Sequence, residues 1–98
     1  MQWDPARIIG FEWDSGNQTK SSDKHAVSCD EAEQVFLNAP MKALADAAHS
    51  KAEPRFHAFG KTGEGRHLTI AFTIRGDLIR VISARPMNRK EKRFYEKR

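Results

Sequence analysis

Residues 68–81 read LTIAFTIRGDLIRV, and this stretch decides the fold. Its apolar side chains alternate with polar or small ones over two β periods, at Leu68, Ile70, Phe72 and Ile74. Such alternation is typical of a strand with one buried face. Gly76 and Asp77 follow as a two-residue turn of the Gly-X kind, which returns the chain as an antiparallel strand. The stretch therefore predicts a β-hairpin.

The length of this turn sets the register of the hairpin and so assigns its side chains to faces. A tight turn places Thr73 opposite Arg80 and Phe72 opposite Val81. One face is then apolar and belongs to the core, with Ile70, Phe72, Ile74, Ile79 and Val81. The other face carries Thr73, Arg75 and Arg80. The hairpin therefore predicts one apolar sheet face and one sheet face that bears arginines.

Three further strands are expected upstream of the hairpin. The β-branched and aromatic run Ile8–Trp13 predicts a first strand, in which Gly10 suggests a bulge. Met41–Asp46 is expected to form a short strand and Arg55–Lys61 another, separated by a polar connection over Ala47–Pro54. Together with the hairpin, these strands predict a mostly antiparallel sheet.

Residues in the first half of the chain also predict helices. Residues 18–25 have room for one or two helical turns. Ser28 and Glu31 form a capping box, which predicts a helix that begins there. Its apolar stripe has helical spacing, with Ala32, Val35, Phe36 and Ala39. Asn38 and Pro40 end this helix.

The C-terminal residues predict a basic helix. Asn88 with Glu91 three residues later repeats the capping pattern for a helix over Arg89–Arg98. Phe94 and Tyr95 are its only apolar anchors, so it is expected to be lightly held. The predicted fold class is α+β, a small domain with helices in the N-terminal half, a mostly antiparallel sheet and this basic helix.

Length and composition exclude several classes of protein. The 98 residues (11.2 kDa) predict a single domain, residues 1–98. No apolar stretch is long enough to span a membrane, and no secretory signal is visible, so a cytoplasmic protein without membrane contact is expected. Cys29 is the only cysteine, which excludes an internal disulfide and a cysteine-based metal site. The four histidines lack metal-ligand spacing, so no metal and no cofactor are expected.

The charge is polarised along the chain. The formal net charge is +4, but residues 1–54 hold five Lys or Arg against nine Asp or Glu, whereas residues 55–98 hold twelve against four. This asymmetry indicates a polyanionic partner for the second half, although a solvated basic tail accounts for it equally well. Residues 85–98 alone contain seven basic and two acidic side chains, so much of the excess lies on the terminal helix.

Arginines on or beside predicted strands give the strongest chemical signal. They are Arg55, Arg66, Arg75, Arg80 and Arg85. A guanidinium binds phosphate in a fixed bidentate geometry. Metal-free cleavage of RNA needs a base for the 2′-OH, an acid for the leaving oxygen and positive charge for the phosphorane. His25 or Glu53 is a candidate for proton transfer, the arginines for the positive charge, and Trp13 for stacking on a base.

Several motifs together resemble BrnT, the toxin of the BrnT/BrnA type II toxin–antitoxin systems. The resemblance extends from Phe11 to Glu96. In the first half it rests on FEWD (11–14), GN (16–17), KH (24–25), VS (27–28), EA (31–32) and VF (35–36). In the second half it rests on HS (49–50), RF (55–56), GR (65–66), FTIRGD (72–77), IRVISAR (79–85), Arg93 and YE (95–96).

This resemblance implies a RelE-like fold and a metal-independent endoribonuclease that inhibits translation. It also implies neutralisation by a BrnA-type ribbon-helix-helix antitoxin, through which alone the complex would contact operator DNA. The residues it implies in catalysis are His25, Glu53, Arg75 and Arg80, and those in RNA or phosphate binding are Arg55, Arg66, Arg85 and Trp13. The alternatives are a catalytically inactive module that binds the antitoxin in operon autoregulation, and a plain nucleic-acid binder.

The position after the Lys-His pair departs from the family pattern. Ala26 stands where the family usually has Gly after Lys-His. If this residue adopts a left-handed cap conformation, alanine costs about 1 kcal/mol relative to glycine.

Overall fold

The computed structural model describes residues 7–49 and 52–97, which form an α+β fold with one five-stranded sheet and three α-helices. Its elements in chain order are β1 (Gly10–Glu12), α1 (Lys20–His25), α2 (Cys29–Leu37), β2 (Lys42–Ala45), a 3-10 turn (Ala47–His49), β3 (Arg55–Lys61), β4 (His67–Arg75), β5 (Leu78–Pro86) and α3 (Arg89–Glu96). The predicted fold class is confirmed.

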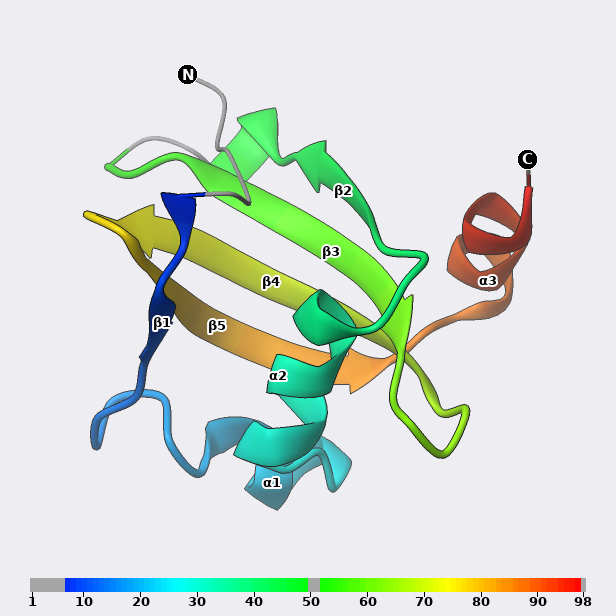
Figure 1. The fold of residues 1–98 in the computed structure, drawn as a ribbon, viewed down its shortest axis with the longest axis horizontal. Coiled ribbons are helices and arrows are strands. Elements are labelled where there is room, and N and C mark those ends of the chain that lie inside the picture. The colour runs from blue at the N-terminus through cyan, green and yellow to red at the C-terminus, as the bar shows by residue number, and fades with distance from the viewer. Residues whose placement is uncertain (1–6, 50–51, 98) are drawn as a thin grey trace.

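The strands lie in the order β1-β5-β4-β3-β2 (Figure 1). β1 is parallel to β5, and every other neighbouring pair is antiparallel. β1 is shorter than the expected strand over Ile8–Trp13. The bulge suggested at Gly10 is wrong, because this residue pairs in regular register with Leu78. The first strand therefore joins the hairpin by a short parallel contact at the sheet edge.

The predicted hairpin register is confirmed next to its turn. Thr73 lies opposite Arg80, and Phe72 lies opposite Val81. Beyond these pairs the register shifts by one residue, so that Ala71 pairs with Ser83. The extra residue reverses which positions of β5 face the core, and Ala84 is therefore fully buried. A turn fixes register only locally, which is why the sequence pattern did not predict this irregularity.

One sheet face forms the core beneath α2, which crosses the strands in Figure 1. The buried apolar residues include Val27, Ala32, Val35, Phe56, Ala58, Leu68, Ile70, Phe72, Ile79, Val81 and Ala84. The close approach of helix and sheet depends on Gly60. A Cβ at this position would lie 2.9 Å from Cγ1 of Val35, so a larger residue would push α2 away from β3.

Cap residues mark the start of α2 and the end of α1. Ser28 and Glu31 make the predicted capping box at the start of α2. Ala26 ends α1 in the left-handed region, with φ of 53°. Because Ala26 adopts the left-handed cap conformation, alanine at this position costs about 1 kcal/mol relative to glycine.

α3 packs over the opposite sheet face, at the end where β4 begins. Its capping box of Asn88 and Glu91 is confirmed. Tyr95 is buried and donates a hydrogen bond to the Pro40 carbonyl at 2.6 Å. Lys42 adds donors to the carbonyls of Phe94 and Lys97 at the end of the helix. The expectation that two aromatic residues alone hold this helix is wrong, because polar groups distant in sequence also bind it.

Between residues 7 and 97, apart from positions 50–51, the structure contains no helix with the length and apolar character needed to cross a membrane.

Candidate functional site

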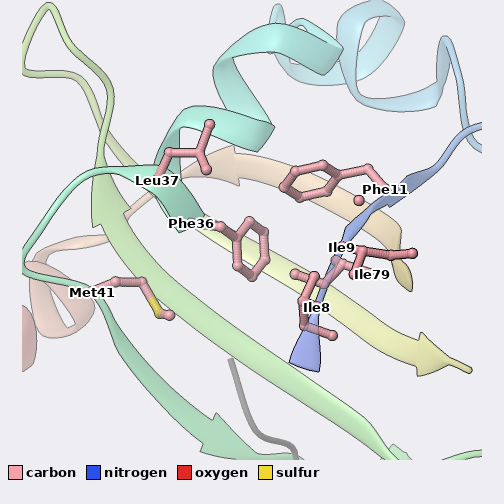
Figure 2. A pocket seen from close by; sticks show the side chains of 8 residues that line it. Ile8, Ile9, Phe11, Phe36, Leu37, Met41 and Ile79 are labelled. Atoms are coloured by element: carbon pink, nitrogen blue, oxygen red, sulfur yellow. The ribbon is translucent and has the colours of Figure 1, made fainter. Parts of the chain in front are cut away.

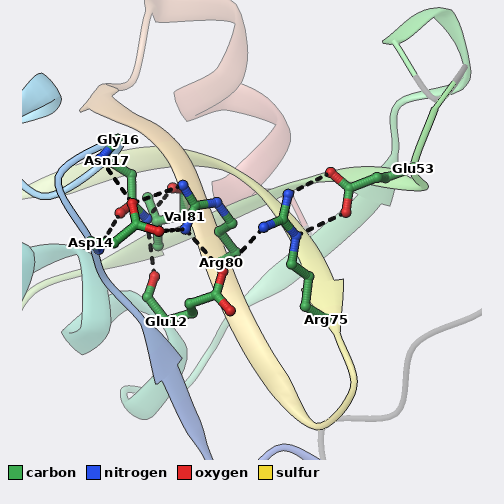
Figure 3. A network of polar contacts seen from close by, with 8 residues as sticks. All are labelled: Glu12, Asp14, Gly16, Asn17, Glu53, Arg75, Arg80 and Val81. Atoms are coloured by element: carbon green, nitrogen blue, oxygen red, sulfur yellow. Dashed lines mark hydrogen bonds and ion pairs between the residues drawn. The ribbon is translucent and has the colours of Figure 1, made fainter.

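The open sheet face, on the side opposite α2 and beyond the cover of α3, gathers the polar groups of the site. Strand alternation turns Arg80 away from the core, next to Thr73 on β4. Arg75 follows on the same face at the end of β4, and Glu12 comes from β1 beside Arg80. Figure 3 shows the side chains of Arg75, Arg80 and Glu12 meeting between β1 and the hairpin. The register of the sheet therefore places two arginines and a carboxylate together.

Arg80 is held by two carboxylates. Its Nη1 lies 2.9 Å from Oε1 of Glu12 and 2.8 Å from Oδ2 of Asp14, and its Nη2 lies 3.0 Å from the other Asp14 oxygen. Arg80 keeps the pKa of Asp14 below its ordinary value, and a hydrogen bond from the backbone N–H of Gly16 acts in the same direction. The side chain of Arg80 is only 16% exposed, whereas that of Asp14 is 54% exposed, so a largely buried guanidinium is paired with an exposed carboxylate.

A turn after β1 positions these carboxylates. Asn17 is buried and donates through Nδ2 to the carbonyls of Glu12, at 3.0 Å, and Val81, at 2.8 Å. The same side chain accepts from the backbone N–H of Asp14. One amide therefore ties the turn to β5 and fixes Asp14 against Arg80.

Arg75 is clamped by Glu53, which comes from the connection between β2 and β3. Nε and Nη2 of Arg75 bind the two Glu53 oxygens at 3.0 and 3.1 Å, and Nη1 lies 3.4 Å from Glu12. Hydrogen bonding by Arg75 lowers the pKa of Glu53, although partial desolvation opposes the shift. Glu53 is therefore ionised at neutral pH with both oxygens engaged, an arrangement that orients Arg75 and disfavours proton donation by Glu53.

A cavity of about 400 Å³ lies beside this network. Its walls are Ala48, His49, Ala52, Glu53, Arg55, Thr73 and Ile82. Thr73 donates to the Pro54 carbonyl at 2.5 Å, which ties the connection before β3 to the sheet. Glu53 thus belongs both to the cavity wall and to the clamp on Arg75. The cavity lining thus contains one guanidinium, Arg55, and one carboxylate, Glu53, which binds Arg75 outside the lining.

The structure also brings together two histidines that the sequence left apart. Nδ1 of His49 lies 2.9 Å from Oδ2 of Asp46, and Nε2 of His57 lies 3.5 Å from the same oxygen. Sequence reasoning missed this cluster because it compared the histidines with metal-ligand spacings, whereas His57 reaches Asp46 from β3. A signal was present, since neighbouring strands of a hairpin bring such positions together.

Arg66 and His25 lie at the other end of β4. Nη1 of Arg66 donates to the Ala26 carbonyl at 2.7 Å and binds Glu31, and Nη2 donates to the His25 carbonyl at 3.2 Å. The nine residues of β4 are separated by eight steps of about 3.3 Å, so its ends lie roughly 26 Å apart. The structure therefore does not bring His25 or Arg66 together with Arg75, and Arg66 joins the end of α1 to the start of α2.

Arg85 lies beneath α3. Its Nη1 and Nη2 bind the two oxygens of Glu91 at 2.7 Å each, and Thr69 donates to the same carboxylate at 3.0 Å. Arg85 chiefly lowers the pKa of Glu91, to about 2, against the opposing effect of burial. This ion pair holds α3 on the sheet.

Trp13 lies on the core side of β1. Its Nε1 donates to Glu33 of α2 at 2.7 Å, and its ring packs against the hydrophobic core. The predicted stacking residue is therefore separated from the open face by the sheet itself.

A second pocket, of about 220 Å³, opens between β1 and the end of α2 (Figure 2). Its lining is apolar and includes Ile8, Ile9, Phe11, Phe36, Leu37 and Met41. Ile9 and Leu37 are exposed at its edge. Because it offers no charged side chain, this pocket does not suit a phosphate backbone. Within the described ranges, no group of three or more His, Cys, Asp or Glu side chains has an arrangement that would hold a metal ion.

The fold and the site define a small α+β protein that presents clamped arginines beside a cavity on an open sheet face. The family model for the ribonuclease toxin BrnT of type II toxin–antitoxin systems matches residues 13–91, so the chain belongs to this family. The predicted family membership is thereby confirmed. An RNA substrate and an antitoxin partner follow from membership in this family. The comparison with curated proteins gives no match.

Proposed function

We propose that this protein cleaves RNA without a metal ion at the cavity on its open sheet face. The observation that carries the proposal is the clamp of Glu53 on Arg75, which places a fixed guanidinium beside that cavity. Arg80 lies next to Arg75, and one oxygen of Glu12 contacts both guanidinium groups. Two neighbouring guanidinium groups match the negative charge that develops on a phosphorane.

The carboxylates that bind Arg80 compete with RNA for its hydrogen-bond donors. Asp14 and Glu12 are partly exposed, and they occupy the Arg80 donors that a phosphate would use. An RNA phosphate therefore replaces a carboxylate on Arg80, whereas Glu53 keeps Arg75 aligned. Arg55, on the cavity wall, adds positive charge along the RNA backbone. Arg66 and Arg85 support the fold through their bonds to Glu31 and Glu91.

We assign the protein's partners on the family likeness. The antitoxin is a BrnA-type ribbon-helix-helix protein, and operator DNA is bound only by that protein in the complex. The toxin acts on translation in the cytoplasm. Copurification with the product of a neighbouring reading frame, followed by its sequencing, tests the type of antitoxin.

Cleavage in a chelator tests the catalytic proposal. The toxin is separated from its antitoxin under denaturing conditions, refolded, and incubated with RNA in EDTA and, in parallel, in Mg²⁺. Equal cleavage in both buffers is expected. Cleavage only in Mg²⁺ contradicts the metal-free mechanism, and intact RNA in both buffers contradicts ribonuclease activity. The Arg80→Ala variant, purified identically, reveals any contaminating nuclease.

The ion pairing of Arg75 and Arg80 favours a second candidate, a catalytically inactive module that binds the antitoxin. In that case the carboxylates keep the arginines permanently occupied. Expression without the antitoxin separates the two functions. A ribonuclease toxin arrests growth, and coexpressed antitoxin restores it, whereas an inactive module leaves growth unchanged.

A further inference from the structure

A carboxylate fixes one histidine at the cavity. Asp46 places both oxygens on Nδ1 of His49, at 2.9 and 3.1 Å, and its own side chain is only 10% exposed. The backbone N–H of Asp46 donates to the Arg55 carbonyl at 2.7 Å, which continues the pairing of β2 with β3. The carboxylate is thus held by the sheet, and the imidazole is oriented by the carboxylate.

The remaining nitrogen of His49 is available to a substrate. Its side chain is 65% exposed and forms part of the cavity wall with Glu53 and Arg55. Because Nδ1 is engaged, Nε2 is the atom that can accept a proton, and it has no hydrogen-bond partner among the described residues. A histidine whose Nδ1–H is held by a carboxylate has the tautomer that a general base needs.

We propose that His49 is the general base of this ribonuclease and that Asp46 is its positioning residue. The assignment rests on the ribonuclease function proposed above, and it identifies the proton acceptor at the same cavity. Nε2 of His57 lies 3.5 Å from Oδ2 of the same carboxylate. The charged and titratable groups around His49 are therefore Asp46, His57, Glu53 and Arg55.

The step conserves atoms and electrons. Nε2 of His49 takes the proton of a ribose 2′-OH, and the 2′-oxygen forms a bond to the adjacent phosphorus. The bond from phosphorus to the 5′-oxygen breaks, and that oxygen takes a proton from water. The hydroxide left behind recovers the proton from the imidazolium. The products are a 2′,3′-cyclic phosphate and a 5′-hydroxyl, and His49 returns to its neutral form.

Geometry distinguishes His49 from the two candidates suggested by the sequence. Both oxygens of Glu53 bind Arg75, which lowers the pKa of this carboxyl and makes it a weaker proton acceptor. His25 lies beyond the far end of β4, where its carbonyl binds Arg66. His49 alone among these three side chains combines an orienting carboxylate with a place on the cavity wall.

Chemical rescue tests the assignment on the full chain. The His49→Ala variant is compared with the unaltered protein and with a matched control, His67→Ala, whose imidazole packs against Tyr95 away from the cavity. Cleavage of a short RNA is expected to fall by about 100-fold or more in His49→Ala. The control variant is expected to cleave RNA at a rate within about twofold of the unaltered protein, because its substituted side chain is remote from the cavity. Added imidazole restores part of the lost rate, which a folding defect would not allow.

The separation of kcat from KM tests Asp46. In Asp46→Asn the imidazole loses the carboxylate that orients it, so kcat falls while the KM for RNA stays as it is, because Asp46 holds His49 and not the substrate. An unchanged kcat overturns the positioning role. Full cleavage by His49→Ala, or a loss that imidazole does not restore, overturns the base assignment while the ribonuclease function stands. Intact RNA with the unaltered protein overturns the ribonuclease proposal and the assignment together.

Discussion

Two arginine–carboxylate clusters share one sheet face and differ in what covers them. Arg85 and Thr69 lie beneath α3 and bind Glu91 of that helix, whose side chain is 17% exposed. Arg75, Arg80 and the carboxylates around them lie at the other end of the hairpin, and Asp14 is 54% exposed. The ion-pair geometry is similar in both clusters, with contacts near 2.7 to 3.4 Å. What separates them is the exposure of the carboxylates, because the Arg80 side chain is only 16% exposed whereas that of Arg85 is 37% exposed.

This difference assigns each cluster a different task. A partly buried pair with satisfied hydrogen bonds resists replacement, because its partners have given up their hydration. A pair whose carboxylate is exposed exchanges that carboxylate for another anion at little cost, since water screens the charges. The cluster under α3 therefore stabilises the fold, and the exposed cluster is available to RNA. Each of the following substitutions tests one side of the comparison.

The largest effect is expected from Arg80→Ala. Loss of this guanidinium removes charge stabilisation from the phosphorane, so RNA cleavage should fall by about 10²- to 10³-fold. The melting temperature should fall only modestly: Arg80 itself is 16% exposed, but the carboxylates left behind, Glu12 and Asp14, are 31% and 54% exposed and can be hydrated. Single-turnover cleavage and thermal denaturation measure the two quantities. A variant that cleaves normally removes Arg80 from the catalytic site.

Glu91→Gln should have the opposite signature, with cleavage retained and stability lowered by about 2 kcal/mol. The pKa of Glu91 is lowered to about 2, so its contribution is present above the ordinary pKa near 4.5 and is lost as pH falls toward 2. Urea denaturation at pH 6 and pH 3 should therefore show a larger acid loss in the unaltered protein than in the variant.

Glu96→Gln, on the same helix, is the matched control for this change. Glu96 is exposed, so its substitution should leave both stability and the acid dependence as they are. If the two variants behave alike, the ion pair under α3 does not have the structural role inferred for it.

The smallest effect is expected from Asp14→Asn. This change weakens the competitor for Arg80 and keeps an oxygen for the backbone N–H of Gly16. RNA should bind roughly threefold more tightly at low salt, with the gain reduced by added salt. Fluorescence anisotropy with a noncleavable 2′-deoxy oligonucleotide measures the affinity. Asp30→Asn, on α2 and away from the open face, serves as the control; an equal gain there indicates a general charge effect.

Patterning predicted the elements well because their signals are local. The alternation in β4 and the Gly76 turn fixed the first pairs of the hairpin, and two capping boxes located the starts of α2 and α3. The register shift in β5 was not predicted, since it depends on packing beyond the turn. The anchoring of α3 was underestimated for a related reason, as Lys42 contacts it from 52 or more residues away.

The candidate site was predictable only in its residue types. Arg75 and Arg80 were placed on one face by the hairpin, and this placement is confirmed. The pairing of Arg75 with Glu53 was not predicted, nor was the distance that separates His25 from both arginines. The predicted catalytic roles stay predictions until cleavage is measured. The Asp46 cluster shows why spacing along the chain is a poor guide to such groupings. Its second histidine, His57, comes from β3, eleven residues after Asp46.

The sequence by itself determined the family, the α+β class and the two faces of the hairpin. These features depend on short-range order, because side-chain alternation, turn residues and caps act over a few positions. Only the tertiary structure decided which arginines are clamped, which are covered and which histidine reaches the cavity. Those outcomes depend on burial and on contacts between distant segments, and a chain that buries one ion pair and exposes another encodes both with the same residue types.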